Sequence, residues 1–369
     1  MTKRTTATAG GFFSASFAAA VVSAASVSPR LLNGSMAQGL LTILLSFVIT
    51  SLAAIPVWLL DRQNLGLLEA ARLYLGAGIA RVLGGLYYAA GTYYSYSFLA
   101  FFLVFIENTL NPAVPVWVIA LCIVGASLYG AWKGMATAAR AGIFAAALIV
   151  LSFVLMFIAL ARQIEVQRIQ MFSVGTWTPQ EAVLLISRRS TMLMDIMILL
   201  PRVSGKKAAG FLWCNICGHV LSAVLIVFMA GTLGIFAVNQ LFPAYTLAVM
   251  ADLGAVQRLD MVFLVLWIVS LVMRITLNLL SGSYAFQIRE QSLLRKTNPV
   301  PPRLWMMAIQ ALVVAVFAAA TADFFPLQQH LFSSYFVVYS ASVLFLVIPI
   351  LILLIVWLRT GRKGRDYEK

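Results

Sequence analysis

Residues 141–161 read AGIFAAALIVLSFVLMFIALA, an uncharged apolar run that lies between Arg140 and Arg162. A helix that crosses the hydrocarbon core of a bilayer needs about 20 mostly apolar residues. The run therefore predicts a membrane-spanning α-helix. Its apolar character is continuous rather than alternating, which argues against a strand of a membrane β-barrel.

Runs of the same kind fill almost the whole chain. We place ten spans, numbered 1 to 10 in chain order, near 9–28, 37–60, 82–106, 114–132, 141–161, 180–201, 210–238, 260–285, 304–322 and 333–358. The composition agrees, because 62% of the residues are hydrophobic and 10% are charged, whereas about 25% are charged in a typical soluble domain. No connecting segment is long enough for a soluble domain, so we expect residues 1–369 to form a single integral membrane domain.

The Lys and Arg residues between the spans predict the orientation of the chain. If the N-terminus is inside, 19 of the 26 basic residues fall on the inner loops and termini. The positive-inside rule then places both termini in the cytoplasm, which requires an even number of spans. The net charge of +14 is this topological bias, with some attraction to anionic lipid, and does not indicate nucleic-acid binding. The seven exceptions are Arg30, Arg162, Arg168, Arg188, Arg189, Arg258 and Arg274.

Ten spans with short loops divide into two halves of five. Span 1 runs from inside to outside and span 6 runs from outside to inside, so the halves have opposite orientation. This arrangement is what an inverted-repeat secondary transporter requires, and such folds bind substrate where the first helix of each repeat is broken near mid-membrane. The two halves show no clear sequence repeat, so this prediction rests on span count and topology.

Span 1 carries a candidate binding segment. Small and hydroxyl residues, Ser23, Ala24, Ala25 and Ser26, precede Pro29. They permit either a local break in the helix or close packing against a neighbouring helix. Both alternatives stay open from the sequence alone.

Span 3 carries tyrosines well inside its apolar run. Tyr93 and Tyr94 lie roughly midway along it, followed by Tyr96, rather than at the ends where an interfacial aromatic belt would place them. Their hydroxyls are candidates for lining a polar cavity. The alternative is that they form hydrogen bonds between helices.

Span 6 carries a cluster of polar and charged residues, namely Ser187, Arg188, Arg189, Ser190, Thr191 and Asp195. Ionisable groups within a span usually face a cavity or a partner group. In a helix, Arg188, Thr191 and Asp195 share one face, which predicts a polar stripe toward the bundle interior. Alternatively the span starts near Ser190, and both arginines lie at the outer interface with their charged ends in water.

Span 8 carries Arg274 midway along its length. A lone arginine at that depth needs a carboxylate, backbone carbonyls or water. Asp195 is the only evidently buried acid, so we predict an ion pair between spans 6 and 8. The two residues are candidates for a buried charge pair or for coupling to an ion.

Motifs for catalysis or for a metal are missing from the sequence. It contains no GxxxxGK[ST] loop, no HExxH motif and only two histidines, so we predict that the chain is not an enzyme. Cys214 and Cys217 lie near His219, but a closed zinc site needs four ligands. We therefore predict no metal and no cofactor.

A pattern at the end of span 7 and through span 8 resembles a known family. It runs from Gly231 and Gly234 through Phe242-Pro243 and Tyr245 to Arg258-Leu259-Asp260, Trp267 and Arg274. This block resembles the GerAB-type subunits of bacterial endospore germinant receptors. Shorter matches lie elsewhere in the chain, at Leu68-Glu69 with Arg72 and Gly76, at Tyr129 with Gly134 and Arg140, and at Pro201 with Lys206-Lys207.

The resemblance implies an all-α membrane protein with a ten-helix, five-plus-five inverted-repeat (LeuT/APC-like) fold, within the amino acid/polyamine/organocation transporter superfamily. It implies a subunit that recognises a small germinant, often an amino acid, beside two partner subunits in the spore inner membrane. The chain departs from the family's pattern in three places. Ser23 and its neighbours stand where glycines are usual, Asp195 stands where glutamate is frequent, and Arg188-Arg189 has no counterpart.

Three functions remain in competition. The first is a germinant-recognising subunit with a mid-membrane pocket between spans 1, 3, 6 and 8, where the candidate ligand-binding residues named above would meet the ligand. The second is a free-standing amino acid transporter that uses the same fold and site. The third is a structural assembly subunit without a ligand, which predicts that side chains fill the cavity.

Overall fold

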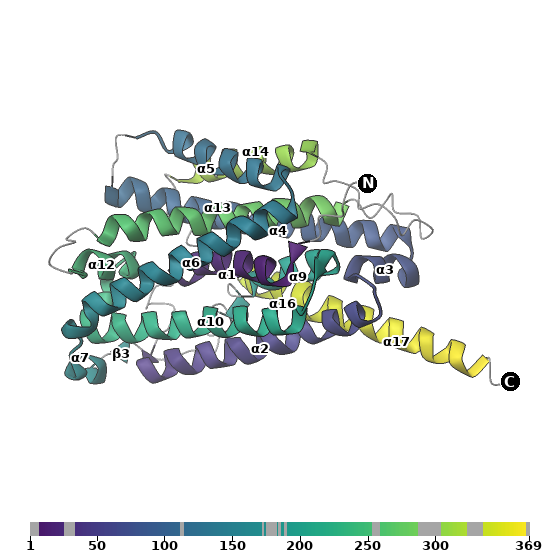
Figure 1. The fold of residues 1–369 in the computed structure, drawn as a ribbon, viewed down its shortest axis with the longest axis horizontal. Helices are drawn as coiled ribbons and strands as arrows, with labels where there is room; N and C mark the ends of the chain where they lie inside the picture. The colour runs from purple at the N-terminus through teal and green to yellow at the C-terminus, as the bar shows by residue number, and fades with distance from the viewer. Residues whose placement is uncertain are drawn as a thin grey trace.

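The computed structural model is almost entirely helical, and its long helices lie side by side along the length of the molecule (Figure 1). It describes residues 7–25, 34–110, 114–171, 173–174, 183, 186–187, 190–252, 259–286, 304–322 and 335–366. Seven of the helices in these ranges are long and apolar enough to cross a membrane, and the shorter helices Ala9–Ala24 and Val116–Trp132 are also apolar. The predicted class, a helical multi-pass membrane protein, is therefore confirmed.

The first half of the chain contains six of the labelled α-helices and one amphipathic connector. In order they are α1 (Ala9–Ala25), α2 (Met36–Arg62), the connector α3 (Leu67–Leu75), α4 (Ala77–Phe105) with its π-helical end η2 (Ile106–Leu110), α5 (Val116–Trp132), α6 (Met135–Leu160) with the 3-10 turn η3 (Ala161–Gln163), and the short α7 (Val166–Met171). Each of predicted spans 1 to 5 overlaps one of these helices.

The second half follows a similar order. Its elements are α9 (Thr191–Leu199) with the 3-10 turn η4 (Leu200–Arg202), α10 (Lys207–Phe228) with its π-helical end η5 (Met229–Leu233), the short α11 (Phe236–Asn239) and α12 (Pro243–Met250), α13 (Leu259–Phe286), α14 (Leu304–Thr321), α16 (Tyr335–Ser342), η7 (Val343–Val347) and α17 (Ile348–Asp366). Most of the N-terminal half of predicted span 6 lies outside the described residues.

Two small sheets fix the relative direction of spans 1 and 6. Strand β1 (Ala7–Thr8), just before α1, pairs with β4 (Val203–Ser204), just after η4. Strand β2 (Gly34–Ser35), between α1 and α2, pairs with β3 (Ser173–Val174), which precedes span 6. The start of span 1 therefore lies beside the end of span 6, and the two spans run in opposite directions.

Helix α13 is the centre of the packing. It contacts α1, α4, α5, α6 and α9, and every residue from Met273 to Ala285 is buried. Small residues allow close approach elsewhere, since a Cβ atom added at Gly142 of α6 would lie 2.5 Å from the Ala15 Cα of α1. Such contacts are typical of helix pairs in membranes.

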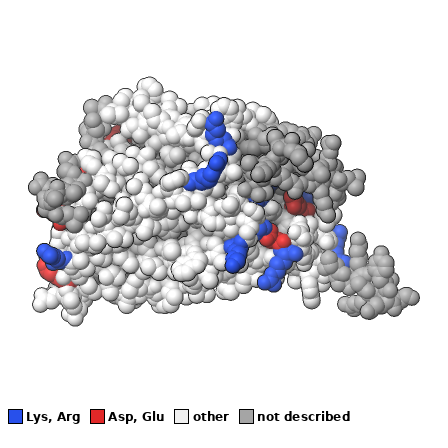
Figure 2. Space-filling model, viewed as in Figure 1, with Lys and Arg blue, Asp and Glu red and all other residues white. Residues whose placement is uncertain are grey.

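The outward surface of the bundle is apolar. Large hydrophobic side chains such as Leu44, Phe144, Ile158 and Phe317 are exposed, which suits contact with lipid tails. In Figure 2 most of the visible surface carries no charged residue, and the Lys and Arg side chains gather toward the end that carries the C-terminus. One further cluster of charges lies at the opposite end.

Helix α1 is continuous from Ala9 to Ala25, so Ser23 and Ala24 lie inside a regular helix. The Ser23 hydroxyl donates a hydrogen bond to the Ala20 carbonyl at 2.7 Å, within its own helix, and Ala24 is buried. Of the two alternatives for this segment, close packing therefore holds as far as Ala25. The candidate Ser26 lies outside the described residues, as does Pro29.

Candidate functional site

A fully buried ion pair lies where α9 meets α13. The Arg274 Nη1 atom is 3.0 Å from the Asp195 Oδ2 atom, and neither side chain has any solvent exposure. The structure thus contains the ion pair predicted between spans 6 and 8. A buried charge is costly unless it is paired and hydrogen-bonded, so each residue accounts for the presence of the other.

Helix α1 joins this pair through its backbone. The Arg274 Nε atom donates a hydrogen bond to the Ala19 carbonyl at 3.2 Å, and the Ser270 hydroxyl, one turn earlier on α13, donates to the Ala18 carbonyl. One guanidinium group therefore links α1, α9 and α13 in the centre of the molecule.

Four buried polar atoms, two in the pair itself and two on the same helices, have no hydrogen-bond partner among the described residues. They are Asp195 Oδ1, Arg274 Nη2, Thr191 Oγ1 and Trp267 Nε1. Thr191 lies one turn before Asp195 on α9, and Trp267 lies two turns before Arg274 on α13, so each shares a face with its charged neighbour. A buried polar group without a partner costs about 1–3 kcal/mol, which makes these atoms the natural contacts for a polar ligand.

The other serines predicted for the site make local hydrogen bonds. The Ser187 hydroxyl donates to the Val183 carbonyl at 2.8 Å, and the Ser190 hydroxyl donates to the Ile186 carbonyl at 2.8 Å. Both side chains are buried, but these bonds already satisfy their donor hydrogens. The predicted Arg188 and Arg189 lie outside the described residues, and Ala25 ends α1.

The tyrosines of α4 bind mainly to spans 9 and 10. Tyr87 donates to the Leu344 carbonyl at 2.7 Å, and the Tyr96 hydroxyl lies 3.1 Å from the Thr321 hydroxyl. The ring of Tyr94 stacks on Phe345 with centroids 6.0 Å apart. Tyr87 and Tyr96 therefore form hydrogen bonds between helices. This is the alternative that the sequence left open beside the lining of a cavity.

The packing of α4 against α9 still places Tyr94 near the ion pair's helix. The Tyr87 hydroxyl lies 3.7 Å from the Met197 sulfur, and Gly91, one turn further along α4, faces Met194. Because α4 and α9 run in opposite directions here, the next turn brings Tyr94 level with Thr191. Tyr93 is partly buried, and its ring lies 5.7 Å from that of Tyr94.

A second polar cluster, between α4, α13 and α14, was not predicted. Asn278 donates to the Ser95 hydroxyl at 2.9 Å, and the side-chain amide of the fully buried Gln310 has no partner among the described residues. A Cβ atom added at Gly282 would lie 2.6 Å from Gln310 Oε1, so this glycine makes room for the amide. The signal in the sequence was a single glutamine inside an apolar span.

The block that suggested a family runs from the end of α10 through α11 and α12 into α13. Gly231 and Thr232, in the π-helical end of α10, accept hydrogen bonds from the Glu165 backbone and the Arg168 side chain. Gly234 has a φ of 56°, which favours glycine. The rings of Phe242, Tyr245 and Trp267 then pack around Phe105 with centroids 4.7–5.0 Å apart. An aromatic cluster therefore packs on the first half of α13, two turns before Arg274.

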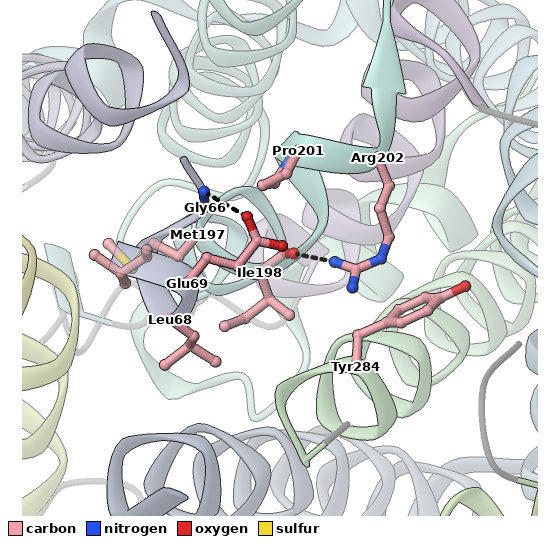
Figure 3. A pocket seen from close by; sticks show the side chains of 9 residues that line it. Gly66, Leu68, Glu69, Met197, Ile198, Pro201, Arg202 and Tyr284 are labelled. Atoms are coloured by element: carbon pink, nitrogen blue, oxygen red, sulfur yellow. Dashed lines mark hydrogen bonds between the residues drawn. The ribbon is translucent and has the colours of Figure 1, made fainter. Parts of the chain in front are cut away.

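A small hollow lies near the C-terminal end of α13, between α3, η4 and α13 (Figure 3). Its empty volume is about 260 Å³ including space open to the surface, which is below the roughly 300–1,000 Å³ of ordinary ligand pockets. The Arg202 guanidinium lies 4.1 Å from the Tyr284 ring centroid and donates to the Ile198 carbonyl. Burial lowers the pKa of Arg202, whereas Tyr284 and Glu69 raise it. The hollow is thus a packed joint between α3, η4 and α13.

The cysteines that suggested a metal or redox set lie in different surroundings. Cys214 is buried with its sulfur 3.4 Å from the Met192 sulfur, whereas Cys217 is exposed. His219 contacts the Asn215 carbonyl and the Ser46 hydroxyl instead. The three side chains therefore do not converge on one point.

A bundle of long apolar helices around a buried ion pair defines a multi-pass membrane protein. A solved structure of a Na+-coupled sialic acid symporter, in a substrate-bound outward-open state, has a similar fold, with a TM-score of 0.57 and 12% sequence identity over 91% of this chain and 76% of that one. The chain belongs to the spore germination protein family, whose model matches residues 9–323. No curated protein matched the chain.

The family membership confirms the resemblance seen in the sequence. Both the family and the solved neighbour are membrane proteins of permease type rather than enzymes. Sequence reasoning missed some groups of this site, namely Trp267, Ser270 and the carbonyls of Ala18 and Ala19. The tryptophan had been noted only as part of the family pattern, and a backbone carbonyl leaves no mark on residue type.

Proposed function

We propose that this chain is the germinant-recognising membrane subunit of a spore germination receptor. It binds a small nutrient such as an amino acid in a mid-membrane pocket between α1, α4, α9 and α13. The observation that carries the proposal is the buried Asp195–Arg274 pair, with one polar atom of each residue left over. An unpaired atom of a buried charged group costs more than one of a neutral group, so these two atoms differ from the unpaired neutral side chains elsewhere in the core.

An amino acid has the charges that these atoms lack. Its ammonium group would donate to Asp195 Oδ1, and its carboxylate would accept from Arg274 Nη2 with the Thr191 hydroxyl or the Trp267 indole N–H beside it. Charge-assisted hydrogen bonds of this kind are about twice as strong as neutral ones. Because α1 is continuous as far as Ala25, side chains rather than free backbone N–H groups of span 1 carry this part of the proposal.

Recognition would then act by a shift of conformational population. A ligand that binds one arrangement of α1, α9 and α13 better than another favours that arrangement. We propose that two other receptor subunits read this shift. The chain would act as a single integral domain over residues 1–369 in the spore inner membrane, with cytoplasmic termini.

The order of elements supports a five-plus-five inverted repeat of ten spans. The connector α3 lies between the second and third spans, and α11 and α12 lie between the seventh and eighth. Exchanging the halves also maps the pair β1–β4 onto the pair β3–β2, although one pair is parallel and the other antiparallel. Such a repeat has its substrate site near mid-membrane, and Arg274 lies about midway along α13.

A second candidate is a free-standing secondary transporter for amino acids. The specific observation in its favour is the shared fold with a Na+-coupled symporter, and Asp195 would be its partner for a proton or an ion. Robust uptake of an amino acid by this chain alone in vesicles favours the transporter. Dependence of the response on two neighbouring subunits favours the receptor.

Substitution of Thr191 by valine tests the proposed site in spores. Spores that carry Thr191→Val are exposed to single L-amino acids over a range of concentrations. Loss of one hydrogen bond to a charged group costs about 1.5–3 kcal/mol, so we expect the half-maximal concentration to rise about tenfold or more. The matched control is Thr92→Val, whose hydroxyl bonds to the Tyr88 carbonyl in its own helix. An unchanged dose response at normal protein level would place the ligand elsewhere.

A further inference from the structure

The oxygen atoms around Arg274 are of the kinds that hold a hard cation. They are the Ala18 and Ala19 carbonyls of α1, the Ser270 hydroxyl of α13 and the Asp195 carboxylate of α9. Carbonyl, hydroxyl and carboxylate oxygens are the usual ligands of alkali and alkaline-earth cations in proteins. In this chain two of these oxygens, of Ala19 and Asp195, accept hydrogen bonds from the guanidinium, and a third accepts one from Ser270.

Among the described residues, the charges at this place are already balanced. Asp195 carries the one negative charge of the pair and Arg274 the one positive charge, and both side chains are fully buried. A soluble cation added beside them would leave a net positive charge in an apolar interior, which is unfavourable without a counter-ion. The residues present therefore do not fit a bound Na+ ion at the junction of α1, α9 and α13.

We propose that the Arg274 guanidinium is a tethered cation, which holds α1 and α9 on α13 where a soluble cation would otherwise do so. The stability of this chain is then independent of Na+, unlike a symporter that needs Na+ to assemble its site. The corresponding inference that ligand binding is independent of Na+ rests on the proposed function, whereas the inference about stability does not. Arg274 is thus a positioning residue as well as a candidate ligand contact.

Removal of the tether creates a requirement that the native chain lacks. In Arg274→Ala the Asp195 carboxylate stays buried without the positive charge that it pairs with in the native chain. A small cation or a guanidinium-type molecule that enters the vacated space would restore both the charge balance and the hydrogen bonds. We therefore expect this variant to acquire a dependence on Na+ or on methylguanidinium that the native chain does not show.

The test is the thermal unfolding midpoint of the full chain, purified in detergent without any germinant. It is measured in NaCl, KCl and N-methyl-D-glucamine chloride at one ionic strength, with millimolar methylguanidinium as an added arm. For the native chain we expect the same midpoint in all three salts. For Arg274→Ala we expect a lower midpoint in N-methyl-D-glucamine and a saturable rise with Na+ or methylguanidinium. Arg140→Ala, an exposed position, is the control and should respond to neither.

Either of two results would overturn the proposal. One is a saturable rise of the native midpoint with Na+, which shows that a soluble cation still binds. The other is an Arg274→Ala midpoint that neither Na+ nor methylguanidinium changes. If Arg274→Ala does not fold, the native chain in the three salts still decides the question. A chain that fails to bind any amino acid would contradict the proposed function and leave these results unaffected.

Discussion

Asp195 and Arg274 carry charges in a part of the molecule that water does not reach. Replacing a buried ion pair by apolar residues of similar size is often neutral for stability, whereas removing one partner is strongly destabilising. The pair therefore adds little net stability, but the loss of either partner alone is strongly destabilising. We propose that its spare atoms, Asp195 Oδ1 and Arg274 Nη2, bind the ligand.

The first prediction follows from breaking the pair on one side. Asp195→Asn leaves the Arg274 charge buried without its counter-charge, and we expect a loss of about 3–5 kcal/mol in unfolding free energy. The double variant Asp195→Asn/Arg274→Met should recover most of that loss while it still fails to respond to a germinant. Thermal unfolding in detergent and spore germination are the two measurements.

The control for this prediction is Asp61→Asn. Asp61, near the end of α2, pairs at 2.7 Å with Lys207, at the start of α10, and both side chains are partly exposed. Such a pair contributes little, about 0–1 kcal/mol, so a small effect is expected. If Asp61→Asn and Asp195→Asn were equally destabilising, burial would not explain the behaviour of the central pair.

Residue types alone gave part of this site. A charged residue inside an apolar span is rare, so Asp195 and Arg274 stood out in the sequence and could be paired. Ser187 and Ser190 stood out in the same way, but their hydroxyls bond to carbonyls one turn earlier. A hydroxyl that bonds to its own helix and one that faces a pocket look identical in a sequence, so only coordinates separate them.

At the scale of elements, the contact between α4 and α13 depends on glycine. A Cβ atom at Gly84 would lie 2.5 Å from the Ala285 carbonyl oxygen of α13, whereas a Cβ atom at the adjacent Gly85 meets nothing within 4 Å. The two positions are neighbours in one helix and have the same backbone conformation. They therefore form a matched pair for testing helix packing.

The second prediction uses that pair. Gly84→Ala pushes α4 away from α13, and we expect it to destabilise the protein by about 1–3 kcal/mol, as overpacking usually does. Gly85→Ala should be neutral or stabilise by about 0.5–1 kcal/mol, because alanine favours a helix more than glycine does. Unfolding midpoints of the two purified variants are compared. Equal midpoints would show that α4 and α13 do not approach closely at Gly84.

The third prediction concerns the joint between α3, η4 and α13. Arg202 lies over the Tyr284 ring (Figure 3), and a cation over an aromatic face contributes about 0.5–2 kcal/mol. We expect Tyr284→Phe to keep most of the native stability and Tyr284→Leu to lose about 1 kcal/mol. The unfolding midpoints decide the matter, since a Phe variant as unstable as the Leu variant would point to the tyrosine hydroxyl instead.

The sequence predicted the helices well but not their irregularities. Span 8, expected over 260–285, corresponds to α13 at Leu259–Phe286, because apolar length alone defines a spanning helix. The π-helical segments η2, η5 and η7 were not foreseen, since a π-turn depends on tertiary packing more than on residue type. The continuity of α1 was also open, because small residues suit both packing and a break.

At the scale of the whole molecule, the account rests on the opposite directions of α1 and α9 and on the bias of the basic residues. The bias of the loop charges predicted the orientation of the chain. The paired strands β1–β4 and β2–β3 show that spans 1 and 6 run in opposite directions. Which end faces the cytoplasm stays a prediction of the positive-inside rule.

The fourth prediction tests that orientation. Single cysteines are placed at Lys133, on a predicted inner loop, and at Arg168, on a predicted outer loop, in a chain whose own cysteines are replaced by serine or alanine. In intact cells we expect an impermeant maleimide to label Arg168→Cys and not Lys133→Cys. The reverse pattern would invert the assigned topology, and detergent-opened cells, in which both positions should react, serve as the control.

The most direct test of the central claim is equilibrium binding of amino acids to the purified native chain and to Arg274→Lys. Each L-amino acid is titrated singly by calorimetry. We predict that at least one binds the native chain, and that Arg274→Lys binds it about tenfold or more weakly, because lysine keeps the charge but loses the spare Nη2 donor. Native-like affinity in Arg274→Lys, or binding of no amino acid by a folded native chain, would contradict the account.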